Sequence, residues 1–234
     1  MSTSDQSSSS QPGIGPEGVS HDAFFEAYAA ERGAPWDVGR PQPAVLDAIA
    51  RGWFARGPVL DAGCGTGVNL EPILKATSHD MVAVDCVPMA VEQARERIRR
   101  VGMSERVTFG TCDLRAFDPE TSEVAGIEPN RFGGILDSGV LHVFSDQDRL
   151  RYLRGLACAA TAEASLVVLV FSDRETRPHG PRRMTESELR TLLPATGWWI
   201  RDLLPHHYQS HPHPGGAEAW LVHATLRPDI DSCD

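Results

Sequence analysis

The residues best suited to chemistry in this sequence are closely spaced glycines and an aspartate in one short stretch. The stretch Asp-Ala-Gly-Cys-Gly-Thr-Gly begins at Asp61 and ends at Gly67. Glycines at this spacing let a strand-to-helix loop bring its backbone close to a ligand. A dinucleotide-binding loop would carry its third glycine one position later, where this chain has Val68. With an acid at its start, this glycine loop favours a ligand that carries a positive charge over one that carries a pyrophosphate.

Two more acids follow apolar runs farther along the chain. Asp85 ends the run 81–84, where a carboxylate can accept hydrogen bonds from both hydroxyls of a ribose. Asp113 follows the run 107–109, within reach of an adenine amino group, and the amide of Leu114 lies beside it. A single acid after a strand is more often a helix cap or a turn residue. Three acids in order, each at the end of an apolar run, indicate a nucleoside-binding edge.

The composition excludes several classes of function. The chain has 234 residues, of which 22 are basic and 32 acidic, and its formal net charge of −10 disfavours binding to a phosphate backbone. The longest strongly apolar run, Leu166–Phe171, is far shorter than the roughly 20 residues that span a membrane. Five widely spaced cysteines without a CxxC pair argue against a disulfide framework and a cysteine-rich zinc site. We therefore expect a soluble, cytoplasmic protein, a monomer or homodimer, that binds a small molecule and has no nucleic-acid or membrane partner.

Apolar periodicity predicts a single α/β domain. Seven short runs are expected to be strands: 59–61, 81–84, 107–109, 135–136, 166–171, 198–204 and 219–226. Helical periodicity fills most intervals, with Pro88 at a first helical position and with Ser145 and Thr185 as helix caps. This alternation predicts a doubly wound, mostly parallel sheet, in which ligands bind beyond the carboxyl ends of the strands. The glycine loop and the acids lie at those ends.

Three segments are expected along the chain. Residues 1–20 are rich in Ser, Gly, Pro and Gln, which predicts a flexible N-terminal tail. Residues 21–56 contain two helical patterns separated by a loop that prolines bracket, and they are expected to form a helical lid or cap. Residues 57–234 are expected to form the cofactor-binding domain, which leaves little room for a separate substrate domain.

The glycine loop, Asp85, Asp113 and Asp137 resemble the class I S-adenosylmethionine-dependent methyltransferases, over about residues 36–226. The resemblance implies a Rossmann-like domain whose mostly parallel seven-stranded sheet has the order 3-2-1-4-5-7-6 and an antiparallel last strand. It implies S-adenosylmethionine as cofactor, S-adenosylhomocysteine as product, and no metal. The glycine loop would hold the methionine part, Asp85 the ribose and Asp113 the adenine. The full set of implied cofactor-binding residues is Trp36, Arg40, Asp61, Gly63, Cys64, Gly65, Asp85, Cys86, Asp113, Leu114 and Asp137.

Loop segments carry a narrower resemblance. Residues 34–41, Ala-Pro-Trp-Asp-Val-Gly-Arg-Pro, resemble the N-terminal segment of the thiol, halide and thiopurine methyltransferases. Residues 137–144, 171–173 and 180–183 are similar to stretches of bacterial heterocyclic-toxin and quinolone methyltransferases. The chain departs from the wider family in having Phe-Gly where Phe-Asp is usual before strand four, and no Pro-Gly-Gly before strand five. Neither departure touches a cofactor residue.

Transfer of a methyl group from a sulfonium is an in-line displacement that depends on positioning in a dry pocket. The resemblance implies an acceptor heteroatom on a small, fairly apolar molecule, with thiol sulfur as the first expectation and a role in detoxification or secondary metabolism. An oxygen or nitrogen of a phenolic or heterocyclic compound is the alternative. A thiol with a pKa of about 8.5 needs little help, whereas a phenol of about 10 needs a general base. The candidate catalytic residues are His142 and Asp137.

Candidate residues for the acceptor site are Trp36, His142, Arg182, Arg183 and Tyr208. The two arginines could face an anionic group or be solvated, and the tryptophan could instead anchor the N-terminal helix. Four histidines match no metal-ligand spacing, and they are expected either in a mobile loop over the substrate mouth or in a solvated one. They are His206, His207, His211 and His213. An NAD-dependent oxidoreductase and a non-catalytic cofactor-binding protein are the alternatives from other classes.

Overall fold

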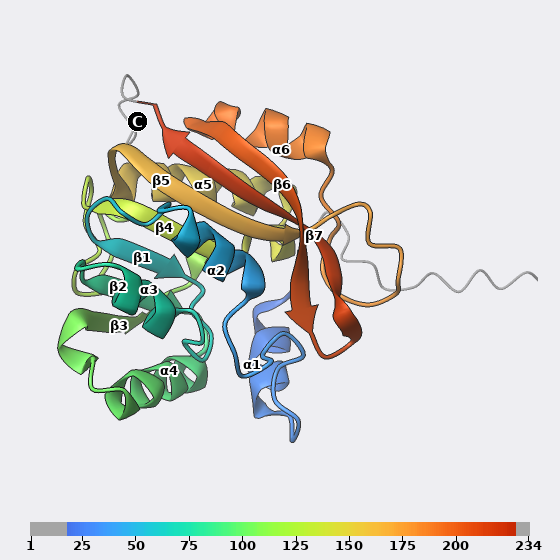
Figure 1. Cartoon of the computed structure of the whole chain (residues 1–234), viewed down its shortest axis with the longest axis horizontal. Helices are drawn as coiled ribbons and strands as arrows, with labels where there is room; N and C mark the ends of the chain where they lie inside the picture. Colours follow the sequence, from blue (N-terminus) through green and yellow to red (C-terminus); the bar gives the residue numbers. More distant parts are fainter. Residues whose placement is uncertain (1–17, 228–234) are drawn as a thin grey trace, which may run out of the picture.

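The computed structural model describes residues 18–227, in which strands and helices alternate along the chain (Figure 1). The strands are Val59–Ala62 (β1), Met81–Asp85 (β2), Val107–Thr111 (β3), Phe132–Ser138 (β4), Ala160–Phe171 (β5), Trp198–Ser210 (β6) and His213–Leu226 (β7). The α-helices are His21–Ala29 (α1), Pro43–Ala50 (α2), Leu70–Ala76 (α3), Pro88–Arg100 (α4), Asp146–Ala159 (α5) and Glu186–Leu192 (α6). Every strand predicted from periodicity is present, and each is longer than predicted.

The strands form one sheet in the order β3-β2-β1-β4-β5-β7-β6. Neighbouring strands from β3 to β5 pair in parallel, and β7 pairs antiparallel with both β5 and β6. The crossing helices place the carboxyl ends of β1 to β5 along one edge of the sheet. The predicted α/β class, strand order and antiparallel last strand are therefore confirmed.

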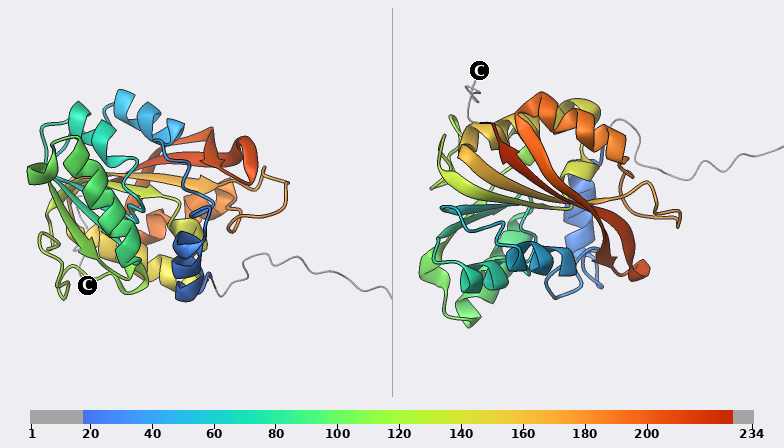
Figure 2. Two further views of the ribbon diagram at one scale, coloured as in Figure 1. Left: turned by 90° about the horizontal axis from the view of Figure 1, so that it is seen from below. Right: turned by 45° about the horizontal axis from the view of Figure 1, so that its top comes forward.

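Two apolar layers hold the helices against the sheet. In β5, Leu166 and Val168 pack in the layer of α5 and α6, whereas Val167 and Leu169 pack in the layer of α2, α3 and α4. Figure 2 shows both faces of the sheet covered in this way. A strand covered on both faces must be apolar at every position, which explains the unbroken apolar run of β5.

Local capping signals set the starts of three helices. The side chain of Ser145 accepts a hydrogen bond from the amide of Asp148 at 3.0 Å, which begins α5. Thr185 and Glu188 form a reciprocal capping box at α6. Pro88 is the first residue of α4. These three predictions are confirmed, and they show that the helix starts depend on local sequence.

Most of the histidine-rich segment lies in a strand hairpin, so the prediction of a loop was wrong except at the turn residues His211 and Pro212. Because β6 runs to Ser210 and β7 begins at His213, His206 and His207 lie inside β6. The prolines that suggested a loop do not end this strand: Pro205 pairs with Trp220 within the ladder. β6 is the edge strand of the sheet, which is where sheets tolerate proline.

The end of this hairpin contacts the segment that follows α1. The amide of His211 donates to the carbonyl of Pro35 at 2.9 Å. The side chain of Gln42 donates to the carbonyl of Gln209 at 2.9 Å and accepts from its amide at 2.8 Å. The N-terminal segment and the hairpin therefore meet beside α1, at the carboxyl ends of the strands (Figure 1).

The predicted tail is described only at its end. Residues 1–17 lie outside the described residues, and the amide of Val19 donates to the carbonyl of Val143 at 2.9 Å. The predicted boundaries of tail, lid and domain stay predictions. From residue 18 to residue 227, no helix has the length and apolarity to cross a membrane. The cytoplasmic location and the monomeric or homodimeric state also stay predictions.

Two adjacent tryptophans test the packing of β6 against α5. Trp198 is fully buried and its indole N–H donates to the carbonyl of Leu153 at 3.1 Å, whereas Trp199 is exposed. We expect Trp198→Phe to lower the free energy of unfolding by about 2 kcal/mol, because it leaves a void and removes this hydrogen bond. Trp199→Phe is the control and should change it by less than about 0.5 kcal/mol. Equal losses in urea unfolding would contradict this packing.

Candidate active site

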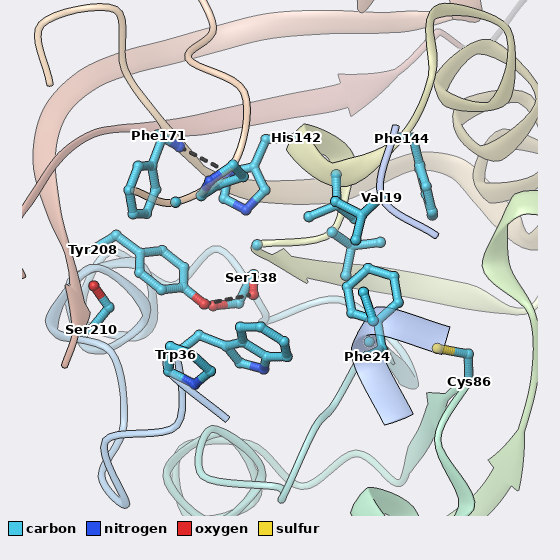
Figure 3. A pocket seen from close by; sticks show the side chains of 18 of the residues that line it. Val19, Phe24, Trp36, Cys86, Ser138, His142, Phe144, Phe171, Tyr208 and Ser210 are labelled. Carbon is cyan, nitrogen blue, oxygen red and sulfur yellow. Dashed lines mark hydrogen bonds between the residues drawn. The ribbon is translucent and has the colours of Figure 1, made fainter. Parts of the chain in front are cut away.

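A cavity of about 440 Å³ lies at the carboxyl ends of the strands, between the sheet, α1 and the end of the β6–β7 hairpin. Most of the side chains that line it are apolar. Phe171, Tyr208 and Ser210 line one end, and Phe24 and Cys86 line the other (Figure 3). The cavity therefore has two ends: residues of β5 and β6 form one, and α1 with the residue after β2 forms the other.

The glycine loop lies beside this cavity in a conformation that other residues would resist. Gly63 and Gly65 have φ values of 86° and 53°, in the left-handed region. A Cβ at Gly63 would lie 2.2 Å from Cγ2 of Val140, and one at Gly65 would lie 2.8 Å from the hydroxyl of Tyr28. Glycine therefore lets the loop pass close to both neighbours. Gly63 lines the cavity, whereas Gly65 and Cys64 are not among its lining residues.

Asp85 connects the glycine loop to the end of β2. Its carboxylate accepts hydrogen bonds from the amide of Gly65 at 2.9 Å and from the amide of Val87 at 3.0 Å. The side chain is buried but lines the cavity, and burial raises the pKa of its carboxyl. Each oxygen of the Asp85 carboxylate thus accepts one backbone amide and keeps a lone pair that a ligand in the cavity can use.

Asp61 is the buried carboxylate that has no partner. It is 1% exposed, and neither of its oxygens makes a hydrogen bond. Burial, with the charges of nearby Asp85 and Asp137, raises the pKa of Asp61 to about 8. An unpartnered buried carboxylate is costly, so a cation beside it would be strongly favoured. Asp61 does not itself line the cavity, but the glycine loop that it begins does so through Gly63, and its unpartnered carboxylate favours a ligand that brings an ammonium or a sulfonium, as S-adenosylmethionine does.

Asp113 and Leu114 lie at the β3 end of the cavity. Arg115 donates to both carboxylate oxygens of Asp113, with the shortest contact at 2.7 Å, and this holds the pKa of Asp113 below its ordinary value. All three residues line the cavity, as does His21 of α1. The predicted adenine-binding residues therefore face the same space as Asp85.

Asp137 lies beneath the cavity rather than in it. The carboxylate is fully buried and accepts hydrogen bonds from the amides of Val140 and Leu141 and from the hydroxyl of Tyr152 at 3.0 Å. Burial raises the pKa of Asp137 to about 6. Because its oxygens serve these donors and it does not line the cavity, its position does not support the predicted catalytic role. It shapes the loop that carries His142.

His142 lines the cavity, but its proton is in the wrong place for the predicted general base. Its Nδ1 accepts a hydrogen bond from the amide of Phe171 at 3.0 Å (Figure 3). Burial lowers the pKa of His142 to about 3, so the ring is neutral at pH 7. A neutral ring whose Nδ1 accepts must carry its proton on Nε2. His142 can therefore donate a hydrogen bond to a ligand, and its geometry argues against proton abstraction.

Trp36 reaches the cavity, and Arg40 does not. The indole N–H of Trp36 donates to the hydroxyl of Tyr28 at 3.1 Å, and its ring packs edge-on against Phe24. The exposed guanidinium of Arg40 lies 3.5 Å from the side-chain oxygen of Gln209. Trp36 therefore both lines the cavity and packs against α1, so it satisfies both expectations for it. Arg40 instead links the N-terminal segment to the hairpin.

The two candidate arginines are engaged elsewhere, and neither lines the cavity. Arg182 forms a 2.5 Å ion pair with Asp146. Arg183 donates to the backbone carbonyls of Glu175, Arg177, Pro181 and His179, and its guanidinium lies 5.7 Å from the ring centroid of Phe171. These partners hold the loop between β5 and α6 in place. The structure therefore corrects the prediction that they bind an anionic substrate group.

Several lining residues were not predicted as site residues. Among them are Val19, Phe24, Tyr28, Phe144, Phe171 and Ser210, whereas His213, which also lines the cavity, belongs to the histidines that were expected either at the substrate mouth or in a solvated loop. The apolar face of the first helix was the available signal, but that pattern is equally typical of core packing. Tyr208, which was predicted, lines the cavity, with its hydroxyl 3.5 Å from the carbonyl of Ser138. Among residues 18–227, no group of three or more His, Cys, Asp or Glu side chains is arranged to hold a metal ion.

The glycine loop and the strands around it match a known family. Residues 59–161 match the methyltransferase domain family. The 2-heptyl-1-hydroxyquinolin-4(1H)-one methyltransferase of Mycobacteroides abscessus is 33% identical over 173 residues, which cover 73% of this chain and 71% of that protein. The chain belongs to the methyltransferase family. Probable thiol methyltransferase 2 of Arabidopsis thaliana is 23% identical to this methyltransferase over 186 residues, 79% of this chain and 78% of that protein.

Solved structures agree with this family membership. The 1,6-didemethyltoxoflavin-N1-methyltransferase of Burkholderia thailandensis, with bound S-adenosylhomocysteine, covers 88% of this chain and 86% of its own, at 25% identity and a TM-score of 0.65. A second solved structure is described as concerning the conversion of a disulfide bond into a thioacetal group during echinomycin biosynthesis. It covers 90% of this chain and 94% of its own, at 25% identity and a TM-score of 0.74. The methyltransferase therefore uses S-adenosylmethionine, and the oxidoreductase and non-catalytic alternatives are set aside.

The unpartnered carboxylate predicts that cofactor binding is linked to a proton. Below pH 8 the carboxyl of Asp61 is mostly protonated, and a cation beside it favours the ionised form. Binding of S-adenosylhomocysteine, which carries an ammonium, should therefore release a proton, and its affinity should rise between pH 6 and pH 8. Calorimetry in two buffers of different ionisation enthalpy measures this release. Binding without proton release would contradict the assignment.

Asp61→Asn supplies the matched control. This variant should bind S-adenosylhomocysteine weakly and with no dependence on pH in this range. The variant should fold, because an amide does not ionise. The wild-type carboxyl has a higher pKa in the folded than in the unfolded protein, so its contribution to stability is full below the unfolded pKa of about 3.9 and is lost as the pH rises through 8. We therefore expect the variant to be more resistant to urea than the wild type at pH 8.5. A less resistant variant would show that Asp61 has partners that the structure does not contain.

Proposed function

We propose that this methyltransferase acts on a heteroatom of a small, uncharged, mainly apolar ring compound, in detoxification or secondary metabolism. The first candidate acceptor atom is a hydroxyl oxygen. The observation that carries the proposal is the charge of the cavity. Of the described arginine and lysine side chains, Arg115 alone lines it, and Arg115 is already paired with Asp113.

The cofactor would occupy the acidic end of the cavity. Asp61 and the backbone of the glycine loop are suited to the methionine part, Asp85 to the ribose, and Asp113 with Leu114 to the adenine. When bound, S-adenosylmethionine supplies a methyl group that its sulfonium makes electrophilic. The chain's own contribution is to hold the acceptor in line with that group and to exclude water, and positioning of this kind supplies roughly 7–11 kcal/mol.

The other end of the cavity is suited to an apolar ring. Phe171 and Tyr208 have ring centroids 5.4 Å apart, and His142 and Phe171 have theirs 5.5 Å apart (Figure 3). An acceptor with a carboxylate would lose its hydration there without gaining a cation as partner. A neutral acceptor loses much less hydration free energy on entering the cavity. The Nε2–H of His142 can donate to one oxygen or nitrogen on the ring of the acceptor.

The relatives support different acceptor atoms. The relative with 33% identity is named for a 1-hydroxyquinolin-4-one, a ring compound with a hydroxyl group and no carboxylate, which favours oxygen. Thiol sulfur, the first expectation from the sequence, is the second candidate, because a thiol methyltransferase is 23% identical over 186 residues. The toxoflavin-pathway enzyme is named as an N1-methyltransferase, so a ring nitrogen belongs in the same test.

Transfer of a labelled methyl group to a matched panel tests the proposal. The panel contains 2-heptyl-1-hydroxyquinolin-4(1H)-one, a ring-carboxylated derivative of it, an aromatic thiol and an unsubstituted N-heterocycle. We expect transfer to the neutral hydroxyquinolone, and a kcat/KM lower by about tenfold or more for the carboxylated derivative, because its charge is buried unpaired. Equal or faster transfer to the carboxylated derivative would contradict a neutral acceptor, and transfer to the thiol alone would identify sulfur.

Matched variants connect this activity to the assigned cofactor end. Asp85→Ala should abolish measurable binding of S-adenosylhomocysteine in calorimetry, because Asp85 both fixes the glycine loop and faces the cavity. Asp80→Ala, at the exposed position just before the same strand, is the control and should bind normally. Normal binding by Asp85→Ala would overturn the assignment of the nucleoside position.

A further inference from the structure

The cavity contains a second buried histidine, and the neighbours of its ring nitrogens differ from those of His142. His213 begins β7, is 1% exposed and lines the cavity. Its ring packs edge-on against Phe171, with centroids 5.3 Å apart. Phe171 is therefore flanked by both histidines at the end of the cavity that is suited to the acceptor.

The two nitrogens of His213 have unequal surroundings. Nδ1 lies 2.9 Å from the hydroxyl oxygen of Ser210, and Nε2 is buried without a hydrogen-bond partner. The backbone carbonyl of Pro178 is near the ring and favours its charged form, yet it makes no hydrogen bond to Nε2. An unpartnered buried nitrogen beside a ligand cavity is costly unless a ligand uses it.

Ser210 allows His213 to adopt the tautomer with its proton on Nδ1, which is closed to His142. A hydroxyl can either donate or accept, so Ser210 can accept from an Nδ1–H and leave a free lone pair on Nε2. The backbone amide of Phe171 can only donate, which fixes the proton of His142 on Nε2. Of these two cavity histidines, His213 is thus the one that can accept a proton from a ligand.

We propose that His213 is the general base of this methyltransferase, and that it removes the proton of a weakly acidic hydroxyl acceptor. The inference rests on the proposed function, in which the acceptor atom is a hydroxyl oxygen. It assigns His142 the complementary task of donating a hydrogen bond to the acceptor ring. The two histidines then divide the work of binding and of proton removal.

The step balances in atoms and electrons. Nε2 of His213 takes the hydroxyl proton, and the ring becomes an imidazolium whose Nδ1–H donates to Ser210. The acceptor oxygen uses its electron pair to form a bond to the methyl carbon, while the bond between that carbon and the sulfur breaks and its pair stays on the sulfur. His213 then releases the proton to water, and the net products are the O-methylated acceptor, the thioether and one proton.

The charges around His213 keep it neutral and able to act as a base. Burial lowers its pKa below the ordinary value of about 6.5, and Arg177 and Arg183 of the loop before α6 lower it further. Glu175 of the same loop opposes this effect. The other titratable groups of this end of the cavity are His142, His179 and Tyr208. We expect kcat/KM to fall only as the pH drops through the lowered pKa of His213.

The test uses a series of acceptors that differ mainly in acidity. The series consists of 2-heptyl-1-hydroxyquinolin-4(1H)-one and ring-substituted derivatives whose hydroxyl groups are progressively more acidic. We expect His213→Gln to lower kcat for the parent compound by about 10²- to 10⁴-fold, the usual contribution of a general base. The loss should shrink toward nothing for a derivative that is already ionised at the assay pH. Binding of the parent compound to the complex with S-adenosylhomocysteine should change by less than about threefold in calorimetry.

Two further variants serve as controls. His206→Gln, at a half-buried position of the same hairpin that does not line the cavity, should match the wild type with every acceptor. Ser210→Ala should lower kcat for the parent compound less than His213→Gln does and should shift the acid limb of the pH profile, because Nδ1 loses its partner. These variants separate the base from a general effect of changing the hairpin.

The outcomes distinguish this proposal from the proposed function. An equal loss for all acceptors in His213→Gln would overturn the proposal and assign His213 a structural role beside the loop before α6. Wild-type transfer to the hydroxyquinolone with an unchanged rate in His213→Gln would overturn the base and leave the proposed function standing. Failure of the wild type to methylate any member of the series would overturn both.

Discussion

Buried carboxylates at the ends of parallel strands determine how the loops around the cavity fold. Taking such a group out of water costs several kcal/mol unless donors replace the hydration. The amide of Gly65 therefore donates to Asp85 at the end of β2, and the amide of Val140 donates to Asp137 at the end of β4. The two loops meet where a side chain on the glycine loop would collide with Val140. Asp61 is the exception, because no donor of the described chain reaches it, and it is left to attract a cation.

This constraint divides the cavity into an acidic end and an aromatic end. The acidic end gathers carboxylates around the place that we propose for a cationic cofactor, which would give part of the net charge of −10 a local role. The aromatic end contains Phe171, Tyr208, His142 and His213, and burial lowers the pKa of these two imidazoles. Neutral imidazoles can exchange hydrogen bonds and protons with an acceptor without placing a permanent charge beside its ring. The same neutrality explains why an anionic acceptor is unsuited to this end.

The features of the molecule that sequence could predict depend on short stretches of chain. The glycine loop, Asp85 and the helix caps at Ser145 and Thr185 are local patterns, and the alternation of strands and helices follows from apolar period. The parts that it could not predict depend on contacts between distant residues. The proton of His142 is fixed by the amide of Phe171, and Arg183 is engaged by backbone carbonyls of its own loop. The prolines and histidines near position 205 are typical of loops, and their place on an edge strand follows only from the sheet order.

We propose that the unpartnered carboxylate of Asp61 selects the cationic cofactor around which the rest of the site is arranged. A carbon NMR titration of ¹³C-labelled aspartate carboxyls, with the signal of Asp61 assigned by its absence in Asp61→Asn, tests this claim directly. In the free protein we predict a midpoint near pH 8, and with S-adenosylhomocysteine bound we predict an ionised carboxyl throughout pH 6 to 8. The same midpoint with and without the ligand would contradict the account.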